Sequence, residues 1–260
     1  MSRRHLTFDC LGSTLAGSLD EASGKSGLLI VTGGNETRAG AFSNQAYLAA
    51  KIAAEGYPVM RFDRRGVGDS EGVNMGFRSS AEDIAAALVA FRSHCPALER
   101  VVGFGNCDAA SALMLCGGAG FDGLVLSNPW TYEDEHADAP PPPAAIRARY
   151  AAKLKNPREW LRLVSGKVDL EKLARGLASA AAKPAAPTGL GEKMAAGLAR
   201  FCGPTRILIA ERDRTGQAFL ASWDERDTRL HRCRGADHAY SDDTSREWLL
   251  GHLLAALADE

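Results

Sequence analysis

The stretch from Val101 to Leu115, VVGFGNCDAASALML, constrains the fold of this chain more than any other part of it. Two β-branched residues begin an apolar run, glycines precede a polar centre at Cys107, and an apolar segment of helical composition follows. This order is typical of a buried strand that turns sharply into a helix. Only small residues fit beside the tip of so tight a turn, and Gly105 and Ala109 meet that requirement. The sequence therefore predicts a strand, a sharp turn with Cys107 at its tip, and a helix.

The spacing Gly–x–Cys–x–Ala is the pattern of a nucleophile elbow, a strained turn that exposes a reactive side chain. At the N-terminus of the following helix, the helix dipole favours the thiolate form of Cys107. The backbone N–H of Asp108 would face an oxyanion formed nearby. A small buried cysteine with a structural role is the alternative interpretation, and the choice between the two depends on partner residues elsewhere in the chain.

The rest of the chain alternates between short apolar runs, which predict buried strands, and segments that predict helices. Strands are predicted at 27–31, 57–63, 123–127, 205–210 and 228–233, and helices at 42–56, 79–96, 217–225 and 245–258. A hairpin that turns at Gly12 is predicted for residues 3–20. This alternation predicts an α/β fold with a mostly parallel central sheet and helices on both faces.

The composition changes between residues 131 and 200. An acidic and proline-rich connector, DEHADAPPPP, is followed by amphipathic helical sequence and by an alanine-rich stretch of low complexity. We therefore predict an inserted helical lid at 131–200 and a core made of residues 1–130 and 201–260. Trp160, Leu161 and Leu163 are candidates for a lid face over the site, and packing of the insert onto the body is the alternative role for them.

A cysteine nucleophile needs a base to take its proton, and the base needs an acid to fix its tautomer. Cys107, Asp213 and His238 each follow a predicted strand, in the chain order nucleophile, acid, histidine that the nucleophile elbow accompanies. The other five histidines lie in a terminus, a helix, a strand or the connector. Asp237 is the rival acid, but neighbouring residues rarely present both side chains to one point. The sequence therefore predicts a Cys107–His238–Asp213 triad.

Two glycine-rich loops accompany these residues. The loop Gly33-Gly34-Asn35 follows a predicted strand, so its backbone N–H groups, mainly those of Gly34 and Asn35, are expected to form an oxyanion hole with that of Asp108. The loop at 64–70, RRGVGDS, is expected to hold its own turn rather than act in chemistry. GFGNCD lacks the third glycine and the acidic partner of a dinucleotide fingerprint, so nucleotide binding is disfavoured.

Composition excludes several other classes of function. The 260 residues carry a formal net charge of −1, which gives no reason to expect nucleic acid or an anionic membrane as a partner. The six cysteines are scattered, without CxxC pairs or metal-ligand spacing, and this is typical of a reducing compartment. No apolar run follows the basic N-terminus, and none is long enough to span a membrane. A cytoplasmic location is expected.

Several segments together resemble the α/β-hydrolase family associated with the exosortase A system, in its "hydrolase 1" branch. They are FDRRGVGDSEG, GNCDAAS, LSNPW, NPREWLRLVSGKV, ERDRTGQAF and GADHAYS. The resemblance covers almost the whole chain and implies the α/β-hydrolase fold, Cys107, Asp213 and His238 as the triad, and Gly34 with Asn35 near the oxyanion. It also implies a genomic setting beside exopolysaccharide and exosortase genes in Gram-negative bacteria. Ala109 stands where the wider superfamily usually has glycine.

We therefore expect an acyl-processing hydrolase that cleaves ester or thioester bonds through a covalent Cys107 acyl-enzyme, without a metal or other cofactor. The expected partner is a small-molecule acyl substrate, with a carrier-bound thioester as one form of it. Acyl transfer to an acceptor other than water uses the same acyl-enzyme and is the first alternative. A non-catalytic binding protein on the same scaffold is the second.

Overall fold

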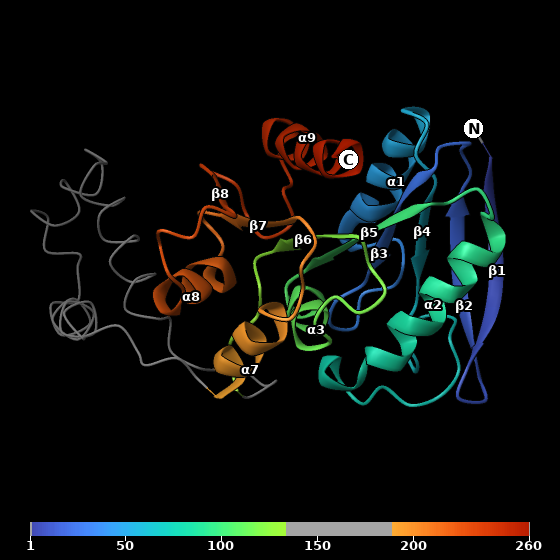
Figure 1. Cartoon of the computed structure of the whole chain (residues 1–260), viewed down its shortest axis with the longest axis horizontal. Coiled ribbons are helices and arrows are strands. Elements are labelled where there is room, and N and C mark those ends of the chain that lie inside the picture. Colours follow the sequence, from blue (N-terminus) through green and yellow to red (C-terminus); the bar gives the residue numbers. More distant parts are fainter. Residues whose placement is uncertain (1, 134–188, 260) are drawn as a thin grey trace, which may run out of the picture.

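The computed structural model describes residues 2–133 and 189–259. Within them eight strands form one sheet in the order β1-β2-β4-β3-β5-β6-β7-β8 (Figure 1). The strands are β1 (Arg3–Cys10), β2 (Ser13–Asp20), β3 (Ser26–Val31), β4 (Val59–Phe62), β5 (Arg100–Asn106), β6 (Gly123–Ser127), β7 (Thr205–Ala210) and β8 (Leu230–Cys233). The pairs β1–β2 and β2–β4 are antiparallel, and every other pair is parallel. The predicted mostly parallel sheet is confirmed.

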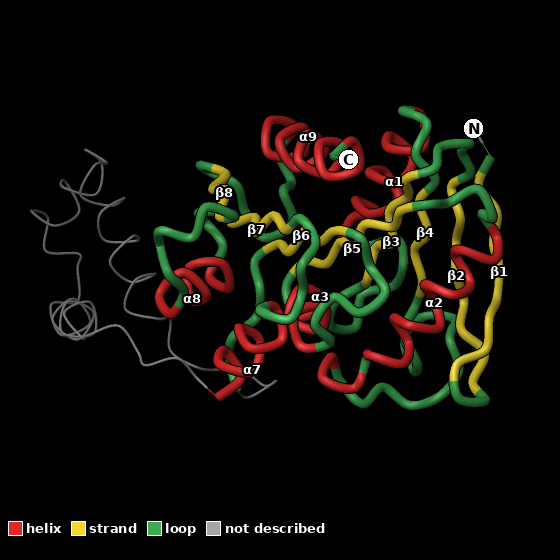
Figure 2. Tube along the Cα trace, in the orientation of Figure 1, coloured by secondary structure: helices red, strands yellow, loops and turns green. Residues whose placement is uncertain are grey.

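Helices cover both faces of this sheet, as the alternation predicts (Figure 2). One face carries α1 (Asn44–Ala54) and α9 (Asp243–Ala258), and the other carries α2 (Ala81–His94), α3 (Asp108–Leu115), α7 (Gly189–Leu198) and α8 (Arg214–Ser222). Two short 3₁₀ helices, Ala41–Ser43 and Phe77–Ser79, precede α1 and α2. None of the helices in the described ranges combines the length and apolar character needed to cross a membrane.

The strand β3 shows how the sequence divides the core into two halves. Leu28 and Ile30 pack toward α1 and α9, while Leu29 and Val31 pack toward α2 and α3, and all four are almost fully buried. This follows from the alternation of side chains along a strand. Because both faces are covered, the run GLLIV is apolar throughout and does not alternate with polar residues.

The predicted hairpin is present at the antiparallel end of the sheet. Leu11 and Gly12 connect β1 and β2 with φ angles of 52° and 78°, which is the tight two-residue turn that suits antiparallel strands. The helix predicted from Phe42 begins two residues later, at Asn44. Phe42 and Ser43 have positive φ angles, and the Phe42 side chain is exposed instead of packed in the core.

Most of the predicted lid, including Trp160, Leu161 and Leu163, lies outside the described residues. Its last part forms α7, which packs against α3. Leu190, Met194 and Leu198 of α7 are buried in the same cluster as the apolar face of α3. This end of the predicted insert is therefore part of the packed core layer, because its helix presents an apolar stripe to α3.

Candidate active site

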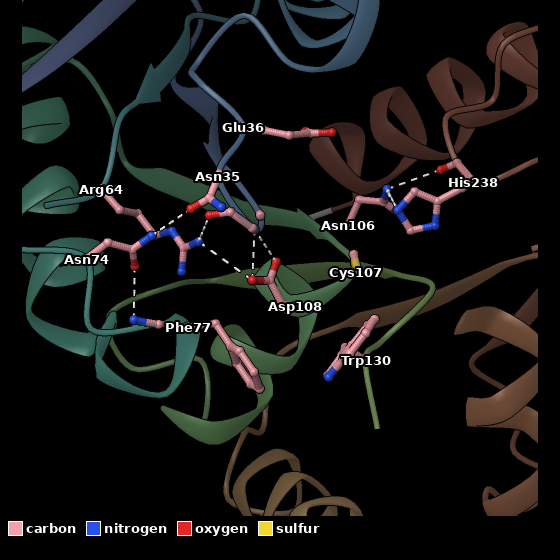
Figure 3. Close-up of a pocket in the computed structure, with 13 residues that line it drawn as sticks. Asn35, Glu36, Arg64, Asn74, Phe77, Asn106, Cys107, Asp108, Trp130 and His238 are labelled. Carbon is pink, nitrogen blue, oxygen red and sulfur yellow. Dashed lines mark hydrogen bonds and ion pairs between the residues drawn. The ribbon is translucent and has the colours of Figure 1, made fainter. Parts of the chain in front are cut away.

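The loops that follow the parallel strands meet at one edge of the sheet and enclose a cavity of about 420 Å³ (Figure 3). Parallel strands place their carboxyl ends at the same edge, which is where ligands bind in sheets of this kind. The lining residues are Gly33, Gly34, Asn35, Glu36, Arg64, Asn74, Gly76, Phe77, Asn106, Cys107, Asp108, Trp130 and His238. Five of the six predicted site residues thus line one cavity, namely Gly34, Asn35, Cys107, Asp108 and His238.

The predicted sharp turn at Cys107 is present between β5 and α3. Cys107 has φ 63° and ψ −127°, a conformation that L-residues rarely adopt. Its backbone is held by a bond from Cys107 N–H to the Ser127 carbonyl at 2.9 Å. A Cβ atom at Gly105 would lie 2.7 Å from the backbone of Ala109, so this position requires glycine. The small residues around the turn therefore have the steric role that the sequence predicts.

The structure brings Cys107, His238 and Asp213 together. His238 Nδ1 lies 2.9 Å from Asp213 Oδ2. The other side of the ring faces the elbow, where His238 forms a side-chain hydrogen bond with Cys107. Asp213 is buried and its carboxylate also accepts hydrogen bonds from the N–H groups of Thr215 and Gly216, as the N-cap of α8. The Asp213 carboxylate is thus held by the N-terminus of α8 and lies against the His238 ring.

The surroundings of His238 favour its protonated form. Burial lowers the pKa of the imidazole, but the hydrogen bonds and charges of Asp213 and Cys107 outweigh burial and raise the pKa from 6.5 to about 10. The side chain remains 41% exposed, so solvent reaches the ring from the cavity. A protonated imidazole between a carboxylate and a cysteine sulfur is the arrangement expected where a cysteine nucleophile is paired with its base.

The rival acid, Asp237, points into its own turn. Its carboxylate accepts hydrogen bonds from the N–H groups of Ala239 and Ser241 and from the Ser241 hydroxyl. These contacts lower the pKa of Asp237, with the Ser241 hydroxyl as the largest cause. Asp237 therefore shapes the loop that carries His238, whereas Asp213 contacts the ring.

A buried polar network behind Cys107 was not anticipated from the sequence. Asn106 donates to the His238 carbonyl at 3.2 Å and its side chain accepts from Asn128 at 3.0 Å. Asn128 also contacts Ser127, whose hydroxyl lies 2.8 Å from the Tyr240 hydroxyl. This chain of bonds joins the ends of β5 and β6 to the His238 loop. The position of Asn106 directly before Cys107 was the available sequence signal.

The predicted oxyanion loop differs from expectation in one respect. The Gly34 N–H is not open to the cavity, because it donates to both carboxylate oxygens of Asp108, at 2.7 and 2.8 Å. A Cβ atom at Gly33 would lie 2.4 Å from the same carboxylate, which explains why glycine stands there. Asn35 lines the cavity as expected, and its side chain accepts a hydrogen bond from Asn74 at 2.9 Å.

Arg64, which the sequence assigns to a self-supporting turn, reaches the site. Its buried guanidinium donates to the Gly34 carbonyl at 2.6 Å and to Ser80 at 2.8 Å, and lies 3.6 Å from Asp108 Oδ2. The loop still holds itself, through bonds such as Val67 N–H to the Arg64 carbonyl. Arg64 thus supports the Gly34 loop and places a positive charge beside Asp108.

Glu36 is a further carboxylate in the cavity that the sequence does not single out. Burial raises the pKa of its carboxyl group, against the opposing effect of the nearby His238. No group of three or more His, Cys, Asp or Glu side chains within residues 2–133 and 189–259 is arranged to hold a metal ion.

Comparison with known proteins identifies the family. Residues 28–250 match the model of the Alpha/beta hydrolase family, and a search of curated sequences gives no match. Because the match covers most of the chain, the chain belongs to this family, and the predicted α/β-hydrolase fold is confirmed.

Solved structures with the same fold share little sequence with this chain. An esterase from Pyrococcus furiosus has 15% identity and a TM-score of 0.61, covering 98% of this chain and 90% of its own. A Xanthomonas campestris protein described as an α/β serine hydrolase without a lid has 14% identity and a TM-score of 0.59, covering 100% and 97%. A thioesterase domain from the curacin biosynthetic pathway has 14% identity and a TM-score of 0.57, covering 98% and 100%.

Proposed function

We propose that this α/β-hydrolase cleaves carboxylic esters or thioesters through an acyl-enzyme on Cys107, with His238 as the base and Asp213 as the residue that orients it. The observation that carries the proposal is the arrangement of His238. Asp213 Oδ2 lies 2.9 Å from its Nδ1, and Cys107 is hydrogen-bonded to the other side of the ring. The esterase and thioesterase among proteins of the same fold support this class of reaction.

Acylation begins with the Cys107 thiolate, while His238 holds the proton. The sulfur forms a bond to the substrate carbonyl carbon, and the π electron pair moves to the carbonyl oxygen. When this oxyanion collapses, the bond to the leaving oxygen or sulfur breaks, and His238 supplies the proton that the leaving group needs. Asp213 keeps the ring oriented and stabilises its positive charge.

Deacylation uses the same groups in reverse. A water molecule attacks the thioester carbonyl, His238 accepts its proton, and the bond between carbon and the Cys107 sulfur breaks. The products are a carboxylic acid and the regenerated thiolate. The open face of the His238 ring gives water a route to the acyl group. The same open face admits an alcohol or amine, so acyl transfer is the second candidate function.

The resemblance to the exosortase-associated "hydrolase 1" branch supplies a proposed setting, in which the acyl group belongs to exopolysaccharide metabolism. A carrier-bound thioester is one proposed form of the substrate. The cavity of about 420 Å³ suits a small acyl group.

Intact-mass measurement after incubation with p-nitrophenyl butyrate and with a panel of acyl thioesters tests the proposal. The wild-type protein is expected to gain the mass of one acyl group on Cys107 and to release the free acid. Cys107→Ala is expected to lose both the adduct and turnover, while Cys202→Ala, which removes an exposed cysteine outside the cavity lining, is the matched control and keeps both. Full turnover in Cys107→Ala would refute the proposed nucleophile. Acylated alcohol in preference to free acid would favour transfer over hydrolysis.

A further inference from the structure

The position of the Asp108 carboxylate has a consequence for the proposed reaction. Gly34 and Asn35 belong to the loop expected to bind the oxyanion, and the Gly34 N–H points at Asp108 instead. The distances of 2.7 and 2.8 Å fall within the range at which a backbone N–H stabilises an oxyanion. A carboxylate oxygen resembles that oxyanion, since both are negatively charged oxygens that accept N–H hydrogen bonds.

We propose that the Asp108 carboxylate occupies the oxyanion position in the resting protein, and that acyl chemistry at Cys107 requires this carboxylate to leave the Gly34 N–H. Asp108 is thereby a residue that limits the rate of the proposed reaction. This inference rests on the proposed function, and it adds a control of the reaction rate that the triad residues do not supply.

Two positive features hold the carboxylate in place. The guanidinium of Arg64 lies 3.6 Å from Asp108 Oδ2 (Figure 3). Asp108 is also the first residue of α3, where a helix terminus attracts negative charge. The side chain of Asp108 is only 13% exposed, so the interaction with the guanidinium is weakly screened by solvent. The same two features would stabilise an oxyanion if the carboxylate were absent.

Support of the loop is the other role that Asp108 can have, and the loop has anchors of its own. Arg64 donates to the Gly34 carbonyl at 2.6 Å, and Glu36 N–H donates to the Gly33 carbonyl at 3.0 Å. The hydroxyl of Thr32 contacts the Phe62 carbonyl at 3.3 Å. These bonds fix the backbone on both sides of the Gly34 N–H without Asp108. Removing the carboxylate should therefore expose the donor and leave the loop in place.

The test compares wild type with Asp108→Ala and Asp108→Asn in the full chain. Asp243→Ala is the matched control, because Asp243 is the first residue of α9 and has an exposed carboxylate. Three quantities are measured: kcat/KM for p-nitrophenyl butyrate, inhibition by an alkyl trifluoromethyl ketone, and the rate at which iodoacetamide alkylates Cys107. The ketone forms a tetrahedral adduct with a thiolate and carries an oxyanion, whereas alkylation needs no oxyanion site.

Asp108→Ala is expected to raise kcat/KM and ketone affinity by at least about tenfold. The upper limit is the ~10²–10³-fold rate effect that one oxyanion donor contributes. Asp108→Asn, which keeps the shape but not the charge, should shift both in the same direction by less. Alkylation of Cys107 should change little, and Asp243→Ala should match wild type in all three measurements. Urea unfolding shows whether each variant is folded.

Two results would overturn the proposal, and they are distinct. Lower turnover and weaker ketone binding in both folded Asp108 variants would assign the carboxylate to loop support and overturn this inference alone. Absence of acyl and ketone adducts in wild type and in both variants would overturn the proposed function and this inference with it.

Discussion

Replacing Asp213 by asparagine separates orientation of His238 from stability of the fold. Asparagine caps helices about as well as aspartate, and with its NH₂ group toward His238 its side-chain oxygen still accepts from the Thr215 N–H, whose partner is Oδ1, while the Gly216 N–H, whose partner is Oδ2, loses its acceptor. Loss of the negative charge at the start of α8 costs about 0.3–1 kcal/mol of folding free energy. The variant should therefore fold, with a small shift in its urea midpoint.

The same substitution should raise the activation free energy of the reaction by much more than it lowers the free energy of unfolding. The asparagine NH₂ group faces His238 Nδ1 only if that nitrogen carries no proton, which places the proton on the nitrogen that faces Cys107. A ring in this tautomer cannot accept the thiol proton. The loss expected for the wrong tautomer is about 10³–10⁴-fold in kcat, equivalent to ~4–5.5 kcal/mol of activation free energy.

Asp237→Asn is the matched control for this prediction. Its carboxylate also bonds to backbone N–H groups and lies beside His238 in sequence, but it does not contact the ring. Weakening a turn contact costs about 1 kcal/mol, so activity should fall by less than about tenfold. Steady-state hydrolysis of p-nitrophenyl butyrate measures both variants. An equal or larger loss in Asp237→Asn would show that the assignment of the acid is incorrect.

Three further predictions concern the thiols, the histidine and the elbow. Iodoacetamide near pH 6.5 should alkylate Cys107 faster than exposed Cys202, and His238→Ala should slow the reaction at Cys107 alone. Cys10 should stay inert, because burial and, to a smaller extent, the neighbouring Asp83 raise the pKa of its thiol to about 11. In an NMR titration the His238 ring should titrate near pH 10, and Cys107→Ala and Asp213→Asn should each lower that pKa, because burial then acts against fewer stabilising bonds. Since the folded pKa is raised, stability from the protonated ring is complete below the unfolded value near 6.5 and is lost as pH rises through about 10. Gly105→Ala should lower the free energy of unfolding by about 1–3 kcal/mol, because the added Cβ meets the backbone of Ala109. Gly251→Ala is the control: it lies on the open face of α9 and should raise the free energy of unfolding by up to about 1 kcal/mol. Urea unfolding measures both variants.

The strands, the turn at Cys107 and the grouping of the triad residues were accessible from the sequence for a physical reason. Apolar runs that end in polar loops identify buried parallel strands, and parallel strands bring those loops to one edge. The contacts of Asp108 and Arg64 were not accessible in this way. They depend on β3 lying between β4 and β5, so that the loops after these three strands are neighbours. The alternation of elements does not reveal which strands pair.

The boundaries of local elements show a similar limit. The apolar character of Phe42 favoured a helix that begins there, but two residues with positive φ angles separate it from α1. Residues 189–198 were grouped with the alanine-rich end of the insert, but Leu190, Met194 and Leu198 of α7 are buried in the core cluster that contains α3. At α7 the deciding contribution came from packing against α3, which is distant in sequence, whereas at Phe42 it came from the local backbone conformation.

The backbone of Cys107 sets stability against chemistry at a single residue. Its φ and ψ angles of 63° and −127° suit glycine, and an L-residue held there costs about 1–3 kcal/mol. A library of variants at this position that is screened only for heat resistance should therefore enrich glycine and discard the thiol. A screen for acyl-adduct formation should retain cysteine and accept the lower melting temperature. The Cys107 side chain would thus be selected against in the first screen and required in the second.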